Sequence, residues 1–114
     1  MIQCKRVYDD ASENDGYRLL VDRLWPRGIK KEALVMDEWC KTLAPSSDLR
    51  KQYHAEIIDF TTFSQLYRAE LDKERAEGLR IAKLAQGQNV TLLYAAKDRD
   101  QNHALVLAAW LSAL

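Results

Sequence analysis

Two predicted strands, separated by more than half of the chain, constrain the fold of this 114-residue sequence more than any other feature. The first covers residues 17–24 and has the continuous apolar run Leu19-Leu20-Val21 at its centre, which is typical of a strand covered on both faces, as in parallel sheets. The second covers residues 89–95 and is expected to be the most buried strand of the chain. Because the segment between them is long enough for a crossover connection, we expect the two strands to pair in parallel.

The segment between the two strands has the hydrophobic period of helices. A short helix is predicted over residues 31–44, with Trp39 and Cys40 on its apolar face. The next two helices are expected to begin at N-cap residues with side-chain oxygens, Ser46 or Ser47 for the first and Thr61 or Thr62 for the second. Gly78 is expected to weaken or bend the second of these.

The two ends of the chain complete the pattern. Residues 2–8 are predicted to form a strand, and residues 102–114 a helix that is apolar on nearly all sides and packs between the sheet and another helix. We therefore predict the α/β fold class, with a single small domain over residues 1–114. Its sheet is expected to be mostly parallel, with three or four strands flanked by helices.

The balance of charges limits the classes of partner. Lys plus Arg is 17 and Asp plus Glu is 17, so the formal net charge is zero. The chain therefore lacks the overall positive charge expected of a protein that binds nucleic-acid backbones, while a locally basic site is still allowed.

The sequence also points to the cytoplasm. Cys4 and Cys40 are far apart and lack CxxC partners, which is typical of a reducing compartment. The start of the chain reaches Lys5 and Arg6 without the apolar stretch of a signal peptide. The longest run without Lys, Arg, Asp or Glu, residues 101–114, is too short to cross a membrane, so no membrane association is expected.

Two segments lie where open α/β sheets bind ligands, just beyond the carboxyl ends of the strands. These are residues 21–28 and residues 95–103. Both carry cationic side chains, which bind phosphate and carboxylate groups well. We therefore predict a cleft for a small anion at this edge of the sheet. The ligand-binding residues expected there are Arg23, Trp25, Arg27, Lys97 and Asn102.

The direction of the first segment decides which side chains share the cleft. If its backbone stays extended, Arg23, Trp25 and Arg27 point to one side and Asp22 to the other. The ring of Trp25 could then stack on a base or on an arginine. The structural alternative is that Asp22 and Arg23 pair with neighbours and Trp25 packs in the core.

His103 and Asp22 are the candidates for proton transfer. His103 lies in the first turn of the last predicted helix, where the helix dipole favours a neutral imidazole that can act as acid or base. Its structural alternative is a hydrogen bond to a loop carbonyl. Arg50 and His54 share one helical face and are added as ligand-binding candidates, the alternative being a solvated helix flank.

No familiar cofactor or catalytic motif occurs in the sequence, so any cofactor is left unknown. The glycine-rich nucleotide loops, the HExxH motif and the GxSxG motif are all absent. The cysteines and histidines lack the spacing of zinc ligands, so no metal site is predicted. Cys40, next to Trp39, is expected to be a buried and unreactive thiol.

Five segments together resemble the family called domain of unknown function 488, and within it the short, YeaO-like bacterial members. They are KRVYD (5–9), DGYRLLVDRLWPRG (15–28), the segment around Trp39, APSSDLRKQYH (44–54) and VTLLYAAKDRDQNHALVL (90–107). The resemblance covers nearly the whole chain. It implies a small cytosolic α/β protein whose activity is not settled.

Longer members of that family resemble this chain less at the second strand edge, where they carry a cysteine-rich version. Here Tyr94 and Asn102 stand in place of two cysteines, Ala96 in place of a glutamate and Ala104 in place of an arginine, and only His103 is kept. The resemblance therefore gives no support to thiol or metal chemistry in this chain. At the first edge, the matching residues are Asp22, Arg23 and Pro26.

Three functions follow from these patterns. The leading one is an anion-binding cleft for phosphate, a nucleotide or a carboxylate, and the sequence leaves open whether the protein is an enzyme. The second is a nucleic-acid-binding regulator, which the neutral charge and the lack of a helix-turn-helix pattern oppose. The third is a non-catalytic interaction module, in which Tyr67 and Trp110 form an exposed homodimer face.

Overall fold

The computed structural model describes all 114 residues, and a four-stranded parallel sheet lies at its centre. The strand order is β1-β4-β2-β3. The strands are β1 (Ile2–Arg6), β2 (Tyr17–Leu20), β3 (Glu38–Trp39) and β4 (Val90–Tyr94). All three strand pairings are parallel, so the predicted α/β class and parallel sheet are confirmed.

The strand predicted over residues 89–95 forms the central strand β4, which pairs with β1 on one side and β2 on the other. All five of its residues are buried. Leu92 lies opposite Cys4 of β1 and Leu19 of β2. A largely apolar strand suits this position because both of its faces and both of its edges are covered, and the polar side chain of Thr91 donates its hydroxyl hydrogen to the carbonyl oxygen of Asp15 at 2.7 Å.

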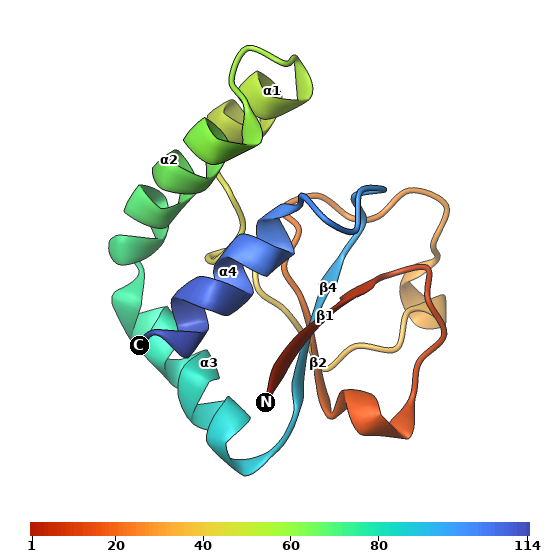
Figure 1. The fold of residues 1–114 in the computed structure, drawn as a ribbon. Helices are drawn as coiled ribbons and strands as arrows, with labels where there is room; N and C mark the ends of the chain where they lie inside the picture. Colours follow the sequence, from red (N-terminus) through yellow and green to blue (C-terminus); the bar gives the residue numbers. More distant parts are fainter.

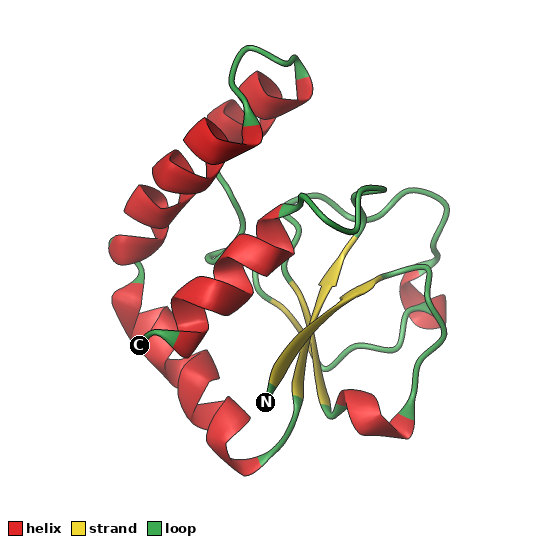
Figure 2. Cartoon of the chain, in the orientation of Figure 1, coloured by secondary structure: helices red, strands yellow, loops and turns green.

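The four α-helices lie on one side of the sheet (Figures 1 and 2). They are α1 (Ser47–His54), α2 (Phe60–Asp72), α3 (Arg75–Gly87) and α4 (His103–Ser112). Apolar on nearly every side, α4 packs between the sheet and the pair α2 and α3, as predicted. None of the helices combines the length and apolar character needed to cross a bilayer.

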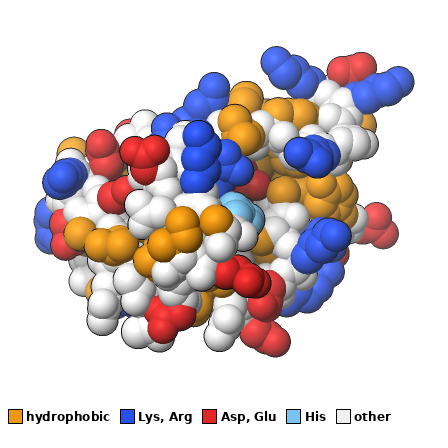
Figure 3. Space-filling model, turned by 90° about the horizontal axis from the view of Figure 1, so that it is seen from above, with side chains coloured by type: hydrophobic (Ala, Val, Ile, Leu, Met, Phe, Trp, Pro, Cys, Tyr) orange, Lys and Arg blue, Asp and Glu red, His pale blue; other side chains and the backbone are white.

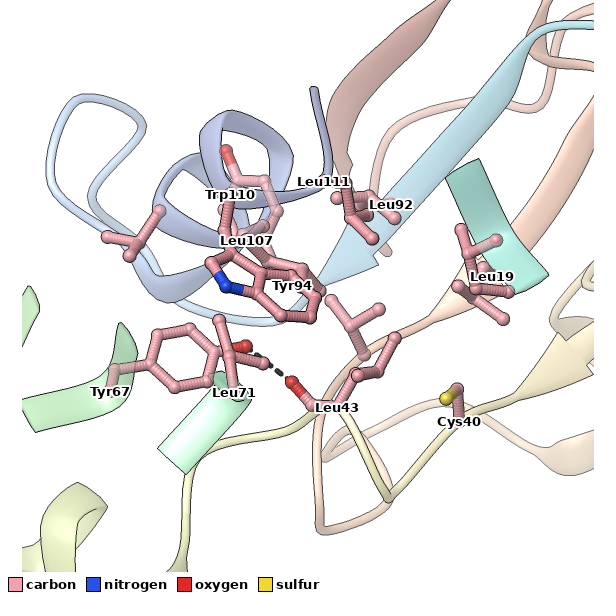
Figure 4. Packing of buried hydrophobic residues seen from close by; sticks show 14 of the residues in the cluster. Leu19, Cys40, Leu43, Tyr67, Leu71, Leu92, Tyr94, Leu107, Trp110 and Leu111 are labelled. Atoms are coloured by element: carbon pink, nitrogen blue, oxygen red, sulfur yellow. Dashed lines mark hydrogen bonds between the residues drawn. The ribbon is translucent and has the colours of Figure 1, made fainter. Parts of the chain in front are cut away.

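The opposite face of the sheet is covered by loops and two short 3-10 helices, Glu13–Asp15 and Lys31–Ala33 (Figure 2). Side chains alternate between the two faces along a strand. Leu19 and Leu92 therefore join the large core beneath the helices (Figure 4), whereas Leu20 and Leu93 pack in a smaller cluster on the loop side. Both leucine pairs are fully buried.

The helix predicted over residues 31–44 is wrong. Only Lys31–Ala33 is helical, and the chain then forms the edge strand β3. The amide of Cys40 donates to the carbonyl oxygen of Leu20 at 2.8 Å, and the Trp39 ring packs edge-on against Trp25. Pairing with β2 thus overrides a helical period that was only two turns long.

Helix boundaries differ from the prediction at two places. Ser46 caps α1 as predicted, accepting the amide of Leu49 at 3.2 Å, but Asp59 rather than Thr61 or Thr62 caps α2. The long helix is interrupted after Asp72, not at Gly78.

Tyr67 and Trp110 do not form an exposed face, so that prediction is wrong. Tyr67 is fully buried and donates its hydroxyl hydrogen to the carbonyl oxygen of Leu43 (Figure 4). Trp110 is 8% exposed and donates its indole N–H to Asp72 at 3.0 Å. Tyrosine and tryptophan each carry one polar group, which made an exposed position plausible from the sequence. In the structure that polar group is hydrogen-bonded within the protein, so both rings can be buried.

Candidate functional site

A pocket of about 490 Å³ opens at the carboxyl ends of β2 and β4. Residues 22–27 line one side, α1 and the adjoining Phe63 of α2 line another, and the β4–α4 loop with the start of α4 completes it. All nine side chains predicted as site residues line this single pocket. They are Asp22, Arg23, Trp25, Arg27, Arg50, His54, Lys97, Asn102 and His103.

The strand predicted over residues 17–24 is shorter in the structure, so the extended backbone that would direct Asp22 to the other side is absent. β2 ends at Leu20 rather than at residue 24, and the chain leaves the sheet after the amide of Val21 donates to Leu93 at 3.0 Å. Asp22 is therefore not directed away from Arg23, Trp25 and Arg27, and all four line the same pocket. The ladder ends here because the next amide along this edge, that of Ala95, donates to the carboxylate of Asp22 and not to a backbone carbonyl.

Asp22 and His103 are in contact at the base of the pocket. The carboxylate Oδ2 of Asp22 accepts the amide of Ala95 at 3.0 Å, and Oδ1 lies 2.9 Å from Nε2 of His103. That nitrogen also lies 3.1 Å from the carbonyl oxygen of Val21. The carbonyl is the better aligned acceptor, since Oδ1 makes no well-directed hydrogen bond. Both neighbours accept hydrogen bonds, which assigns the proton of a neutral His103 to Nε2.

The imidazole of His103 is held on a second side by an aromatic ring. Tyr67 meets it edge-on, with ring centroids 6.3 Å apart. The side chain of His103 is 14% exposed, and its Nδ1 has no hydrogen-bond partner within the protein. The ring is thus fixed at Nε2, while Nδ1 is left for a ligand or water.

Asn102 lines the pocket but uses its polar atoms to begin α4. Its Oδ1 accepts the amide of Leu105 at 3.1 Å, and its Nδ2 donates to the carbonyl oxygen of Asp98 at 2.9 Å. The residue is 2% exposed. Its role in this structure is that of an N-cap.

Arg23 joins two walls of the pocket. Its Nε donates to the carbonyl oxygen of Pro45 at 3.0 Å, and its Nη2 donates to that of Ala44 at 3.3 Å. These bonds tie the segment after β2 to the entry of α1. Arg23 therefore has a structural role whether or not its remaining N–H groups reach a ligand.

Three other cations of the pocket have no ion-pair partner. Arg27, Arg50 and Lys97 form no salt bridge, and the Nε of Arg50 is buried without any hydrogen-bond acceptor. Elsewhere in the chain, arginines such as Arg18, Arg80 and Arg99 pair with carboxylates. Seen from above, Lys and Arg side chains lie on both sides of a histidine in the centre of the face (Figure 3).

The pocket contains four Lys or Arg side chains and a single carboxylate. That carboxylate, Asp22, is already engaged by a backbone amide and by His103. Positive charge is therefore in excess here, in a chain whose total charge is zero. Such an excess in a concave site attracts anions.

Aromatic and apolar side chains fill much of the remaining wall. Trp25 donates its indole N–H to Ile29 at 2.6 Å and packs against Trp39, so it takes part in the loop-side cluster as well as in the pocket. Sequence reasoning missed Tyr53 and Phe63 as pocket residues because both were assigned to apolar helix stripes. The spacing of Tyr53 three residues after Arg50 was a usable signal.

The two cysteines lie outside this pocket. Burial raises the pKa of the Cys4 thiol to about 11, and burial also raises the pKa of Cys40. Both thiols are therefore protonated near neutral pH, and Cys40 is buried as predicted. Cys40 lies close to Glu38 and Glu77, but Arg80 already binds both of these carboxylates.

Comparisons with known proteins find similarity along the whole chain. A family model described as "Inactive DUF488-N3 subclade" matches residues 1–114. "Uncharacterized protein YeaO" of Escherichia coli K12 is 59% identical over 113 residues, covering 99% of this chain and 98% of its own length. "Uncharacterized protein Rv3073c" of Mycobacterium tuberculosis H37Rv is 39% identical over 111 residues, covering 97% of this chain and 93% of its own length.

No solved structure matches the chain. The family match nevertheless spans every element described above, from β1 to α4, and the relatives align over nearly their full lengths. The chain belongs to the DUF488-N3 family, in the subclade described as inactive.

Proposed function

We propose that the pocket binds a small anion carrying a phosphate or carboxylate group, and that the protein acts by binding it. The observation that carries this proposal is the excess of cations around the pocket. Arg27, Arg50 and Lys97 lie there without an acidic partner, and the one carboxylate is bonded to the protein. A bound anion would give these cations the kind of partner that Arg18, Arg80 and Arg99 have in carboxylates.

A buried donor supports the same conclusion. Nε of Arg50 is buried without a hydrogen-bond acceptor in the protein, and Arg50 lines this pocket. Folded proteins leave few buried polar atoms unpaired. A bound anion would supply the missing acceptor.

Binding rather than catalysis agrees with the description of the family as inactive. In this role, Nδ1 of His103 contacts the ligand while Nε2 is held by Val21 and Asp22. The same geometry favours one second candidate, an enzyme in which Asp22 orients His103 and His103 transfers a proton through Nδ1. Conversion of a bound anion to a product by the purified protein would favour the enzyme over the binding protein.

The shape of the site favours a small molecule over a nucleic-acid backbone. The unpaired cations line a concave pocket, whereas duplex binding needs a basic stripe on a surface that a groove can reach. We also place the protein in the cytoplasm, because both cysteines are free thiols. Cell fractionation tests this location.

Thermal unfolding with added anions tests the proposal. We expect phosphate, citrate or AMP to raise the melting temperature by several degrees at saturating concentration, since a ligand at 100 times its Kd stabilises by about 2.7 kcal/mol. Arg50→Gln is expected to weaken binding about tenfold, because a charge-assisted hydrogen bond is lost. Lys51→Gln, its neighbour on α1 outside the pocket, is the matched control.

Two results would contradict the proposal. One is that none of the anions shifts the melting temperature of the wild-type protein. The other is that Lys51→Gln weakens binding as much as Arg50→Gln does, because the effect would then come from general surface charge rather than from the pocket.

A further inference from the structure

We propose that the anion bound in this pocket is carried on a flat aromatic ring, as in a nucleoside monophosphate. This inference rests on the proposed function and adds the class of ligand. The features that carry it are the size of the pocket, the aromatic side chains in two of its walls and the cations that share those walls.

The pocket is larger than a simple inorganic anion requires. Its volume of about 490 Å³ lies within the range of pockets that enclose drug-sized ligands, roughly 300 to 1,000 Å³. An isolated phosphate or acetate would leave most of this space to water. A ligand that fills the pocket has an uncharged part in addition to its anionic group.

Aromatic and apolar side chains line the part of the pocket that is available to the uncharged part of the ligand. Trp25 lies on the side formed by residues 22–27, and Tyr53 lies on the side formed by α1, with Phe63 next to it. Leu24 and Pro45 line the pocket too. Flat rings bind well to walls of this kind because aromatic faces stack and exclude water.

Both aromatic side chains are held in place by neighbouring groups and are only partly buried. The indole N–H of Trp25 donates to Ile29 at 2.6 Å, and its ring lies edge-on to Trp39 with centroids 5.3 Å apart. The Tyr53 ring stacks on Phe63 with centroids 4.7 Å apart. Trp25 and Tyr53 are only half-buried. Rings fixed in this way lose little freedom when a ligand stacks on them.

Each ring shares its wall of the pocket with a cation that forms no salt bridge. Arg27 follows Trp25 by two residues in one wall, and Arg50 precedes Tyr53 by one helical turn in the other. Lys97 adds a third cation from the β4–α4 loop. A ligand whose ring and anionic group are joined by a short spacer matches this arrangement, and a nucleoside monophosphate has that form.

Calorimetric titration of the full chain with matched ligands tests the inference. AMP and phenyl phosphate carry a ring and a phosphate, ribose 5-phosphate carries the phosphate without a ring, and adenosine carries the ring without the charge. We expect AMP and phenyl phosphate to bind at least tenfold more tightly than ribose 5-phosphate. Adenosine is expected to bind more weakly than AMP.

Two pairs of variants locate the effect. Trp25→Leu and Tyr53→Leu are each expected to reduce the advantage of AMP over ribose 5-phosphate severalfold, while the affinity for ribose 5-phosphate changes less than twofold. Trp25→Phe and Tyr53→Phe keep a ring and are expected to retain the advantage. Because Tyr53 donates no hydrogen bond to the protein, its variants remain informative if Trp25→Leu fails to fold.

The outcomes separate this inference from the proposed function. Equal affinity for AMP, phenyl phosphate and ribose 5-phosphate would overturn the aromatic ligand and leave the anion site standing. A ring advantage that survives both leucine variants would also overturn it. The absence of binding by every phosphate would overturn the aromatic phosphate ligand, and if citrate also failed to bind, the anion site would be overturned as well.

Discussion

Nε2 of His103 lies 2.9 Å from Oδ1 of Asp22, and this contact joins the start of α4 to the segment that follows β2. The same nitrogen lies 3.1 Å from the carbonyl oxygen of Val21. The two strand ends that sequence reasoning singled out are therefore physically linked at the base of the pocket. Four predictions follow from the contacts around this link and in the core behind it.

The neutral form of His103 is expected to carry its proton on Nε2, because both neighbours of that nitrogen are hydrogen-bond acceptors. Nitrogen-15 NMR of the imidazole at neutral pH measures the tautomer directly. His54, which is exposed and has no such partners, serves as the internal comparison. A proton found on Nδ1 of His103 would show that the contact with Val21 and Asp22 is not as described.

Substitutions of Arg23 and Arg27 are expected to differ in their effect on the free energy of unfolding. Arg23→Ala removes the donors to Pro45 and Ala44 and should lower the free energy of unfolding by about 1 to 3 kcal/mol. Arg27→Ala removes an exposed side chain and should change stability by less than about 0.5 kcal/mol. Urea unfolding of both variants measures the difference, and equal losses would refute it.

Gly78→Ala is expected to destabilise the protein although alanine is the better helix former. A Cβ at this position would lie 2.3 Å from Cζ3 of Trp110, so α3 and α4 could no longer approach as closely. Overpacking of this kind costs about 1 to 3 kcal/mol, which exceeds the gain in helix propensity of about 1 kcal/mol.

Gly87→Ala is the matched control for that substitution. Gly87 lies in the last turn of the same helix, and a Cβ there would contact nothing within 4 Å. The free energy of unfolding of the Gly87→Ala protein should therefore stay the same or rise. Equal effects of the two alanine substitutions in thermal unfolding would show that helix propensity, and not the contact with Trp110, governs Gly78.

Asp15 is expected to stabilise the fold less as the solution becomes acidic. Burial alone raises the pKa of this carboxyl, but the hydrogen bond from Ser12 and the charges of Lys5 and Arg18 outweigh burial, so its pKa is lowered. Asp15→Asn leaves Arg18, which is 4% exposed, without its charged partner and should cost about 3 kcal/mol at neutral pH.

The pH dependence of this difference has a definite sign. A carboxyl with a lowered pKa in the folded state contributes its full stabilisation above its unfolded pKa of about 4 and loses it as the pH falls through the folded value. The gap in stability between wild type and Asp15→Asn should therefore narrow below about pH 4. Denaturant unfolding at a series of pH values measures the gap, and a gap that widens in acid would contradict the prediction.

The candidate site could be located from sequence because its residues follow strands in a parallel sheet. The carboxyl ends of parallel strands meet at one edge, so Arg23 and Lys97 were expected together without knowledge of any contact. The α1 contributions, Arg50 and His54, follow from helical spacing alone. The roles within the site were not predictable, because Asn102 and Arg23 turned out to bond to backbone groups that the sequence does not place.

The sequence by itself determined the central parallel strand and the final buried helix, because long apolar patterns report burial whatever their partners are. Only the tertiary structure decided that residues 38–39 form a strand, that Gly78 serves a close helix contact and that Tyr67 and Trp110 are buried. Each of these depends on a partner distant in the chain, namely Leu20, the Trp110 ring, Leu43 and Asp72. A local pattern cannot report such partners, because the hydrogen bond or the steric contact exists only after the segments have packed together.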